Sequence, residues 1–205
     1  ARYRLSVMGC DYALRAAVDL IQQVHAGHLP FDRTLRVAPT ENLARPQIVG
    51  RMPQNLATLQ ELIRRDREDF RIAMSSKPLT TDRCAARSRL SRRRCHAATL
   101  VEELGLRIGR VNVMRKKIER ISRRMNELTR QIRELKRSAR PGERLVSARK
   151  ELRRLMRLTL ETPLSLARRI RRVGERLAEY QKASRELAAG NLRLVVSIAK
   201  NYRNR

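Results

Sequence analysis

The feature that most constrains this chain is a long apolar stripe in its middle. Apolar residues recur there at alternating steps of three and four: Val111, Met114, Ile118, Ile121, Met125, Leu128, Ile132 and Leu135. This spacing places them along one face of a helix, in a pattern close to a heptad repeat. A stripe of this length requires an apolar partner along the whole helix.

The next segment supplies such a partner. After a turn over residues 138–142, apolar residues again follow helical spacing at Leu145, Ala148, Leu152 and Leu155. Two long helices joined by a short turn lie side by side, so we predict an antiparallel helical hairpin. Pairing of the stripe with a second copy of the chain is the alternative.

Helices are also predicted before the hairpin. Apolar spacing indicates an amphipathic helix over residues 3–24 and a second helix that begins near Asn55. The four prolines within 28–53 indicate mostly loop between these two helices. A third helix should begin near 80–82 and continue through Gly105 into the apolar stripe.

A final helix is predicted after the hairpin. Thr162 followed by Pro163 is typical of an N-cap and the first helical position, where a proline loses no hydrogen bond. No segment shows the alternation of a β-strand over a useful length. The predicted fold class is therefore all-α, a helical bundle with a long antiparallel helical hairpin.

The charge of the chain narrows the choice of partners. The 205 residues include 48 Lys and Arg against 20 Asp and Glu, which gives a formal charge of +28. An excess of this size favours a polyanionic partner, such as nucleic acid or an acidic protein surface. No apolar run approaches the length of a membrane-spanning helix, and the first residues lack the order of a signal peptide. We therefore expect a cytoplasmic protein with no membrane partner.

Arginines gather in three clusters, within 83–94, around the predicted hairpin turn, and within 168–176. The guanidinium fork binds phosphate groups bidentately, so these clusters suit contact with a nucleic-acid backbone without base reading. The candidates for such contacts are Arg92, Arg93, Arg94, Arg137, Arg140, Arg153, Arg154, Arg168, Arg169 and Arg172.

The sequence shows no catalytic or metal-binding pattern. Phosphate-binding loops and the HExxH metal motif are missing, and histidine is scarce. Carboxylates such as Asp66 and Asp69 stand among arginines, and we interpret them as solvated ion pairs on exposed helix faces. The three cysteines form no CxxC pair, and the spacing of His25 and His28 matches no zinc finger. We expect no enzymatic activity, no metal and no cofactor.

The last fifteen residues, NLRLVVSIAKNYRNR, carry the most specific signal. They resemble the segment that opens the second conserved region of bacterial RNA polymerase sigma factors of the primary (housekeeping) type. The resemblance implies three parts: a first conserved helix region over 1–37, a variable helical insert over 38–176, and the start of conserved region two over 177–205. It also implies that the chain is an N-terminal fragment of a longer protein.

In that family, region two is an all-α domain that docks on the polymerase and melts the promoter. The resemblance therefore implies transcription initiation, with core RNA polymerase and promoter DNA as partners. The residues expected to contact polymerase, or to support that contact from a core, are Asn191, Leu192, Arg193, Val195, Val196, Ile198, Lys200, Asn201, Tyr202 and Arg203. Their apolar members fall on two neighbouring helix faces, so core packing is the first expectation for each of them. Part of this surface should be exposed unless the insert or a second chain covers it.

Two other classes of function fit the same residues. A basic, helical nucleic-acid-binding or ribosome-associated protein would need only the charge of the chain. A coiled-coil scaffold would use the apolar residues between 111 and 160 to form oligomers, and Ile121→Glu would then dissociate the oligomer without unfolding the chain.

Overall fold

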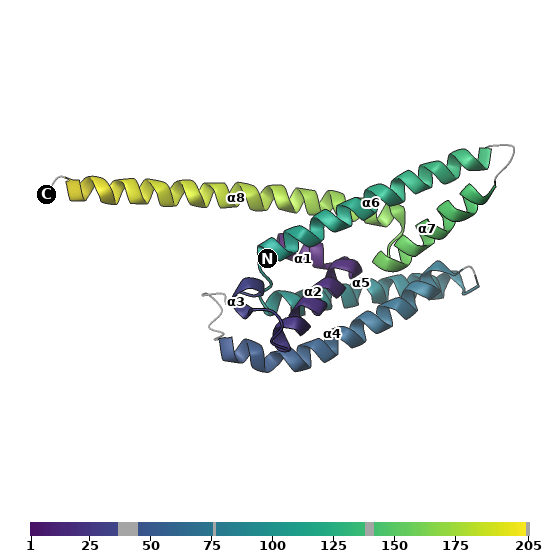
Figure 1. The fold of residues 1–205 in the computed structure, drawn as a ribbon, viewed down its shortest axis with the longest axis horizontal. Coiled ribbons are helices and arrows are strands. Elements are labelled where there is room, and N and C mark those ends of the chain that lie inside the picture. Colours follow the sequence, from purple (N-terminus) through teal and green to yellow (C-terminus); the bar gives the residue numbers. More distant parts are fainter. Residues whose placement is uncertain (37–44, 76, 138–141, 204–205) are drawn as a thin grey trace.

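The computed structural model describes residues 1–36, 45–75, 77–137 and 142–203, and this part of the chain is all-helical. Figure 1 shows a body of packed helices from which one long helix projects. The elements in chain order are α1 (Arg2–Met8), α2 (Asp11–His25), α3 (Phe31–Thr34), α4 (Arg45–Met74), α5 (Thr80–Glu103), α6 (Ile108–Arg137), α7 (Glu143–Thr159) and α8 (Pro163–Arg203). The all-α prediction is confirmed.

Helices α6 and α7 form the predicted antiparallel hairpin (Figure 1). The apolar stripe of α6 is buried at Val111, Met114, Ile118, Met125 and Leu128. Its partners are α7 and, beyond it, α1, α2 and α8. The stripe is thus covered by helices of the same chain, without a second copy.

Helices α4 and α5 form a second hairpin that starts earlier than predicted (Figure 1). We expected mostly loop before Asn55, but α4 begins at Arg45 and passes through Pro53. Residues 37–44 of the predicted loop lie outside the described residues. A proline inside a helix removes one backbone hydrogen bond. The burial of Ile48 and Met52 in the main core favours the continuous helix and offsets that loss.

The predicted first helix is broken into α1 and α2. The break lies at Gly9 and Cys10, and Cys10 has an extended backbone with φ −92° and ψ 126°. A Cβ atom placed on Gly9 would lie 2.7 Å from Nη1 of Arg169, so this side chain crosses the chain where the two helices separate. The apolar spacing continues through the break, which explains why the sequence pattern did not reveal it.

A second break separates α5 from α6, where one continuous helix was predicted. Gly105 adopts a left-handed φ of +71°, and its carbonyl accepts a hydrogen bond of 2.7 Å from the amide of Arg36. Leu35 and Leu106 form an isolated antiparallel β-bridge at the same place. The segment after α3 therefore pairs with the backbone and ends α5.

Helix α8 begins as predicted. The amide of Ser165 donates to Oγ1 of Thr162 at 3.1 Å, and the amide of Thr162 donates to Oγ of Ser165 at 2.9 Å, so the two residues cap the helix reciprocally. Leu166 and Val173 anchor its first part in the core. The helix then continues across Gly190 without interruption.

Candidate functional site

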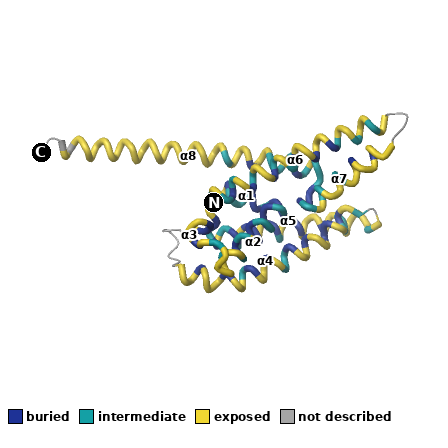
Figure 2. Tube along the Cα trace, viewed as in Figure 1, coloured by how far each residue is buried: buried dark blue, intermediate teal, exposed yellow. Residues whose placement is uncertain are grey.

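The projecting half of α8, residues 178–203, is the most unusual surface of the molecule. Figure 2 shows it exposed on all sides, and every residue from 178 to 200 is exposed. At a rise of about 1.5 Å per residue, this stretch is about 35 Å long. Large apolar side chains along it are exposed by 46% to 76%: Leu187, Leu192, Leu194, Val195, Val196, Ile198 and Tyr202.

These apolar residues do not pack in a core, which was the first expectation for each of them. The last aromatic contact between α8 and the body is made by Tyr180, whose ring stacks on Tyr3 with centroids 5.7 Å apart. The helix points away from the body beyond that residue, so none of the described helices covers its apolar faces. The conditional expectation that part of this surface would be exposed is confirmed.

The apolar residues of the projecting half gather on two neighbouring faces of the helix. At about 100° per residue, Leu187, Leu194 and Ile198 share one face, and the face with Val195, Leu192 and Val196 adjoins it. Exposed Arg193 and Lys200 lie on the side away from Leu187, whereas exposed Asn191 falls within the apolar face and exposed Arg185 shares the face of Leu192. The backbones of Asn201 and Arg203 belong to α8. The surface therefore combines a broad apolar face with a basic back.

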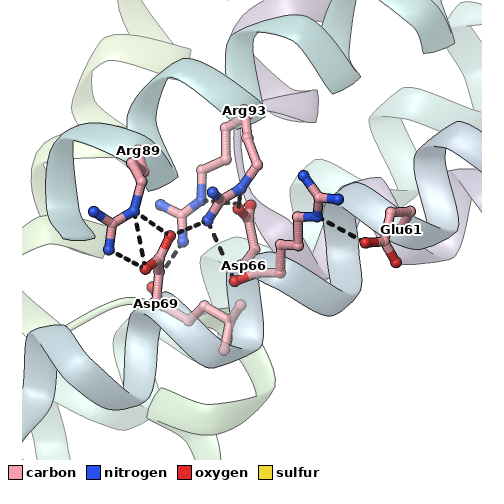
Figure 3. A network of polar contacts seen from close by, with 8 residues as sticks. Glu61, Asp66, Asp69, Arg89 and Arg93 are labelled. Atoms are coloured by element: carbon pink, nitrogen blue, oxygen red, sulfur yellow. Dashed lines mark hydrogen bonds and ion pairs between the residues drawn. The ribbon is translucent and has the colours of Figure 1, made fainter. Parts of the chain in front are cut away.

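Three of the predicted nucleic-acid contacts bind carboxylates within the chain instead. Arg93 donates from Nε to Oδ1 of Asp66 at 2.6 Å and also bonds Asp69 (Figure 3). Buried Arg94 donates from Nη1 to Oε1 of Glu161 at 3.0 Å, and Arg169 donates to the same oxygen at 2.6 Å. An arginine that satisfies a buried carboxylate is not free to neutralise a phosphate, so these three are corrected to structural roles.

The remaining predicted nucleic-acid contacts are exposed. Arg92 lies on α5, Arg137 at the end of α6, Arg153 and Arg154 on α7, and Arg168 and Arg172 on α8, whereas Arg140 lies outside the described residues. None of the six exposed side chains forms an ion pair within the described ranges, and Arg153 only bonds the carbonyl of Arg149 in its own helix. They remain candidates for a polyanion.

Asp66 and Asp69 are not the solvated carboxylates that we expected. They are 1% and 6% exposed, and they hold α4 to α5 across the second hairpin (Figure 3). Burial raises the pKa of Asp66 although Arg93 and Arg94 act in the opposite direction, whereas hydrogen bonds from Arg89 lower the pKa of Asp69. Glu61, which precedes them on the exposed side of α4, forms solvated ion pairs of the expected kind with Arg64 and Arg65.

Asp11, at the start of α2, is a buried carboxylate with a perturbed pKa. Its side chain has no exposed surface, and its Oδ2 lies 2.8 Å from Nε of Arg15. Burial raises the pKa of Asp11 from 3.8 to about 6, although the positive charges of Arg15 and Arg94 lower it. The charged form of this side chain is thus disfavoured in the folded protein.

Replacing Asp11 with asparagine should change how stability depends on pH. The folded pKa exceeds the unfolded value, so the contribution of Asp11 is complete below pH 3.8 and is lost as the pH rises through about 6. Asp11→Asn removes the ionisation, so the fall in the free energy of unfolding between pH 3.8 and about 6, on the order of 3 kcal/mol, should be missing from the profile of the variant. Urea unfolding at a series of pH values measures this for both proteins. Parallel profiles for parent and variant would contradict it.

Comparison with known proteins does not assign the chain to a family. No model of a protein family, no curated protein and no solved structure matches it. Among the described residues, no group of three or more His, Cys, Asp and Glu side chains could hold a metal ion. Nor does any helix in the described ranges have the length and apolarity needed to cross a membrane.

One feature of the molecule escaped the sequence patterns. Arg87, Arg168 and Arg172 line a common cavity between α5 and α8. The spacing of Arg168 and Arg172 indicates a shared helix face, because residues four apart are neighbours on a helix. The position of Arg87 at the same cavity depends on the packing of the two helices, for which the sequence holds no local signal.

Proposed function

We propose that this chain acts in transcription initiation as part of a primary-type sigma factor and binds core RNA polymerase through the projecting half of α8. The observation that carries the proposal is the coincidence of two independent features on one segment. The residues that resemble the opening of sigma region two are also the residues whose apolar side chains stand exposed on the projecting helix.

The exposed apolar face supports a protein partner for this segment. A contiguous row of exposed leucine, valine and isoleucine side chains on a soluble surface typically marks an interaction site. An amphipathic helix with apolar residues at such spacings binds by laying that face into a groove of its partner. The basic back, with Arg193 and Lys200, would then face acidic groups at the rim of the groove or the solvent.

The unpaired arginines support promoter DNA as a second partner. Arg92, Arg137, Arg153 and Arg154 are exposed on α5, α6 and α7, and each phosphate that they neutralise adds about 0.9 to the salt slope of binding. Such contacts are made to the DNA backbone and carry no base specificity. They would add affinity to a complex whose position is fixed by polymerase.

The structure favours the two other functions, a coiled-coil scaffold and a basic RNA-binding protein, less than the polymerase proposal. The scaffold depends on a free apolar stripe, but the stripe of α6 is covered within the chain. A basic protein recruited to RNA by charge alone would use the arginines and leave the apolar face of α8 without a role. We therefore place the polymerase proposal first.

Binding to bacterial core RNA polymerase tests the proposal. We expect saturable binding that survives moderate salt and an excess of duplex DNA, and we expect Val195→Glu to weaken it roughly thirty-fold, as for the loss of a contact worth about 2 kcal/mol. Val195 is 61% exposed, so the substitution should not affect folding. Fluorescence anisotropy of a labelled chain measures the affinity.

Val146→Glu is the matched control. Val146 lies on α7 and is 63% exposed, so the same change adds the same charge at similar exposure outside the projecting half. If both variants lose affinity equally, or if polymerase and DNA are released together as salt rises, the chain binds polymerase only as a polycation. That result would contradict the proposal and favour the RNA-binding alternative.

A further inference from the structure

Four helices meet around a cavity in the body of the molecule. The cavity has a volume of about 680 Å³ and is lined by residues of α1, α4, α5 and α8, together with the turn between α7 and α8. This volume falls within the range of about 300–1,000 Å³ that is typical of small-molecule sites. The cavity is thus large enough for a ligand of that class.

The base of the cavity is held by an internal ion-pair network. Glu161 accepts hydrogen bonds from Arg94 at 3.0 Å and from Arg169 at 2.9 Å and 2.6 Å. Arg94 also donates to the carbonyl of Leu160 at 2.8 Å. Both Arg94 and Glu161 are buried, so the network fixes α5 against the start of α8. The lining arginines therefore project from elements that are held in a defined position.

Three further arginines line the cavity without a carboxylate partner. Arg87 comes from α5, and Arg168 and Arg172 come from adjacent turns of α8. All three are exposed, and none has an ion pair or a hydrogen bond within the described part of the chain. Glu161 is the single acidic residue among the lining residues, which include five arginines. The cavity thus holds a strong excess of positive charge.

Apolar side chains form another part of the cavity wall. Leu5 of α1, Met74 of α4, and Leu90 and Ala98 of α5 contribute to it. Inorganic phosphate would satisfy the arginines but would leave this wall without a partner. A ligand with an anionic end and an apolar or planar body fits both parts of the cavity.

We propose that this cavity binds a phosphorylated organic molecule of the nucleotide class. Its phosphate groups would lie between Arg87, Arg168 and Arg172, whose guanidinium forks bind phosphate oxygens bidentately. Its body would contact the apolar wall formed in part by Leu90 and Met74. This site is independent of the polymerase proposal, because it involves neither the projecting half of α8 nor a protein partner.

Two cysteines of α5 allow a local test. Cys95 is exposed and lines the cavity, whereas exposed Cys84 lies three turns earlier outside its lining, and Cys10 is buried. ATP should slow the alkylation of Cys95 by N-ethylmaleimide roughly ten-fold when its concentration is about ten times Kd, by simple competition. The alkylation of Cys84 in the same chain should not change. Mass spectrometry of both peptides over time measures the two rates.

Matched charge variants separate a site from general polyanion binding. Arg168→Ala with Arg172→Ala should abolish the protection of Cys95 by ATP. Arg149→Ala with Arg154→Ala removes the same charge from α7, outside the cavity lining, and should preserve it. Inorganic triphosphate should protect more weakly than ATP, because it lacks a body for the apolar wall.

Three outcomes would overturn the proposal. Equal protection of Cys84 and Cys95 would show non-specific association with a basic chain. Equal loss of protection in the two double variants would show that net charge, not the cavity, attracts the ligand. If triphosphate protected Cys95 as strongly as ATP does, the apolar wall would contribute nothing to binding. The cavity would then bind anions in general and would not be a nucleotide site.

Discussion

Replacing Asp66 with alanine is expected to lower the free energy of unfolding by about 4 kcal/mol. Asp66 is 1% exposed and accepts a hydrogen bond of 2.6 Å from Nε of Arg93, while Nε of Arg94 lies 3.9 Å from its other oxygen. The substitution leaves both guanidinium groups at least partly buried with one carboxylate fewer. The cost of an unpaired buried charge exceeds the net value of the pair itself. Urea unfolding followed by circular dichroism measures the change.

Glu61→Ala is the control for this prediction. Glu61 lies on the same helix and accepts hydrogen bonds from Arg64 at 2.7 Å and 2.9 Å and from Arg65 at 2.7 Å. Its side chain is 41% exposed, so water replaces the lost partners, and the unfolding midpoint should scarcely move. Equal destabilisation by the two substitutions would contradict the claim that burial, rather than the number of hydrogen bonds, determines the cost.

Replacing Gly105 with valine is expected to lower the free energy of unfolding by about 4 kcal/mol. Strain in the left-handed backbone and overpacking should contribute about equally to this loss. The φ of Gly105 is +71°, which a β-branched residue rarely adopts. A Cβ atom at this position would lie 2.3 Å from the carbonyl oxygen of Arg36, which is backbone and cannot rotate away. The substitution should therefore break the pairing between the segment after α3 and the start of α6.

Gly174→Val tests whether the effect belongs to the position. Gly174 lies inside α8, where nothing stands within 4 Å of an added Cβ atom. Valine is at least as favourable as glycine in an open helical position, so this variant should unfold at the same or a higher urea concentration. A Gly105→Val protein that is as stable as the parent would show that the backbone at this break can relax without cost.

The sequence predicts those parts of the fold that depend on local spacing. The α6–α7 hairpin follows from two apolar stripes around a short turn, and the start of α8 follows from Thr162 and Pro163. The breaks at Gly9 and Gly105 could not be predicted in this way. At each break a distant group packs against the glycine, the side chain of Arg169 in one case and the backbone of Arg36 in the other. The apolar spacing continues through both.

The charged residues were harder to predict than the apolar ones. Asp66 pairs with Arg93, 27 positions away, although arginines stand closer in the sequence, at positions 64 and 65. Local spacing favoured solvated pairs because it contains no information on how α4 and α5 face each other. The same limit hid the fact that Arg87 and Arg168 line one cavity. The exposure of the projecting half could be anticipated, because two apolar faces on one helix need more cover than one neighbour provides.

The unbroken course of α8 links the direction of its apolar face to the number of residues that precede it. The helix is capped at Thr162, anchored by Leu166 and Val173, and continuous to Arg203. One residue inserted after the anchor would turn everything beyond it by about 100° and advance it by about 1.5 Å. Two full turns would restore the direction but shift the apolar face by about 10 Å. The length and the rotation of the helix therefore set both the distance and the angle between the body and a partner bound at the far end of α8.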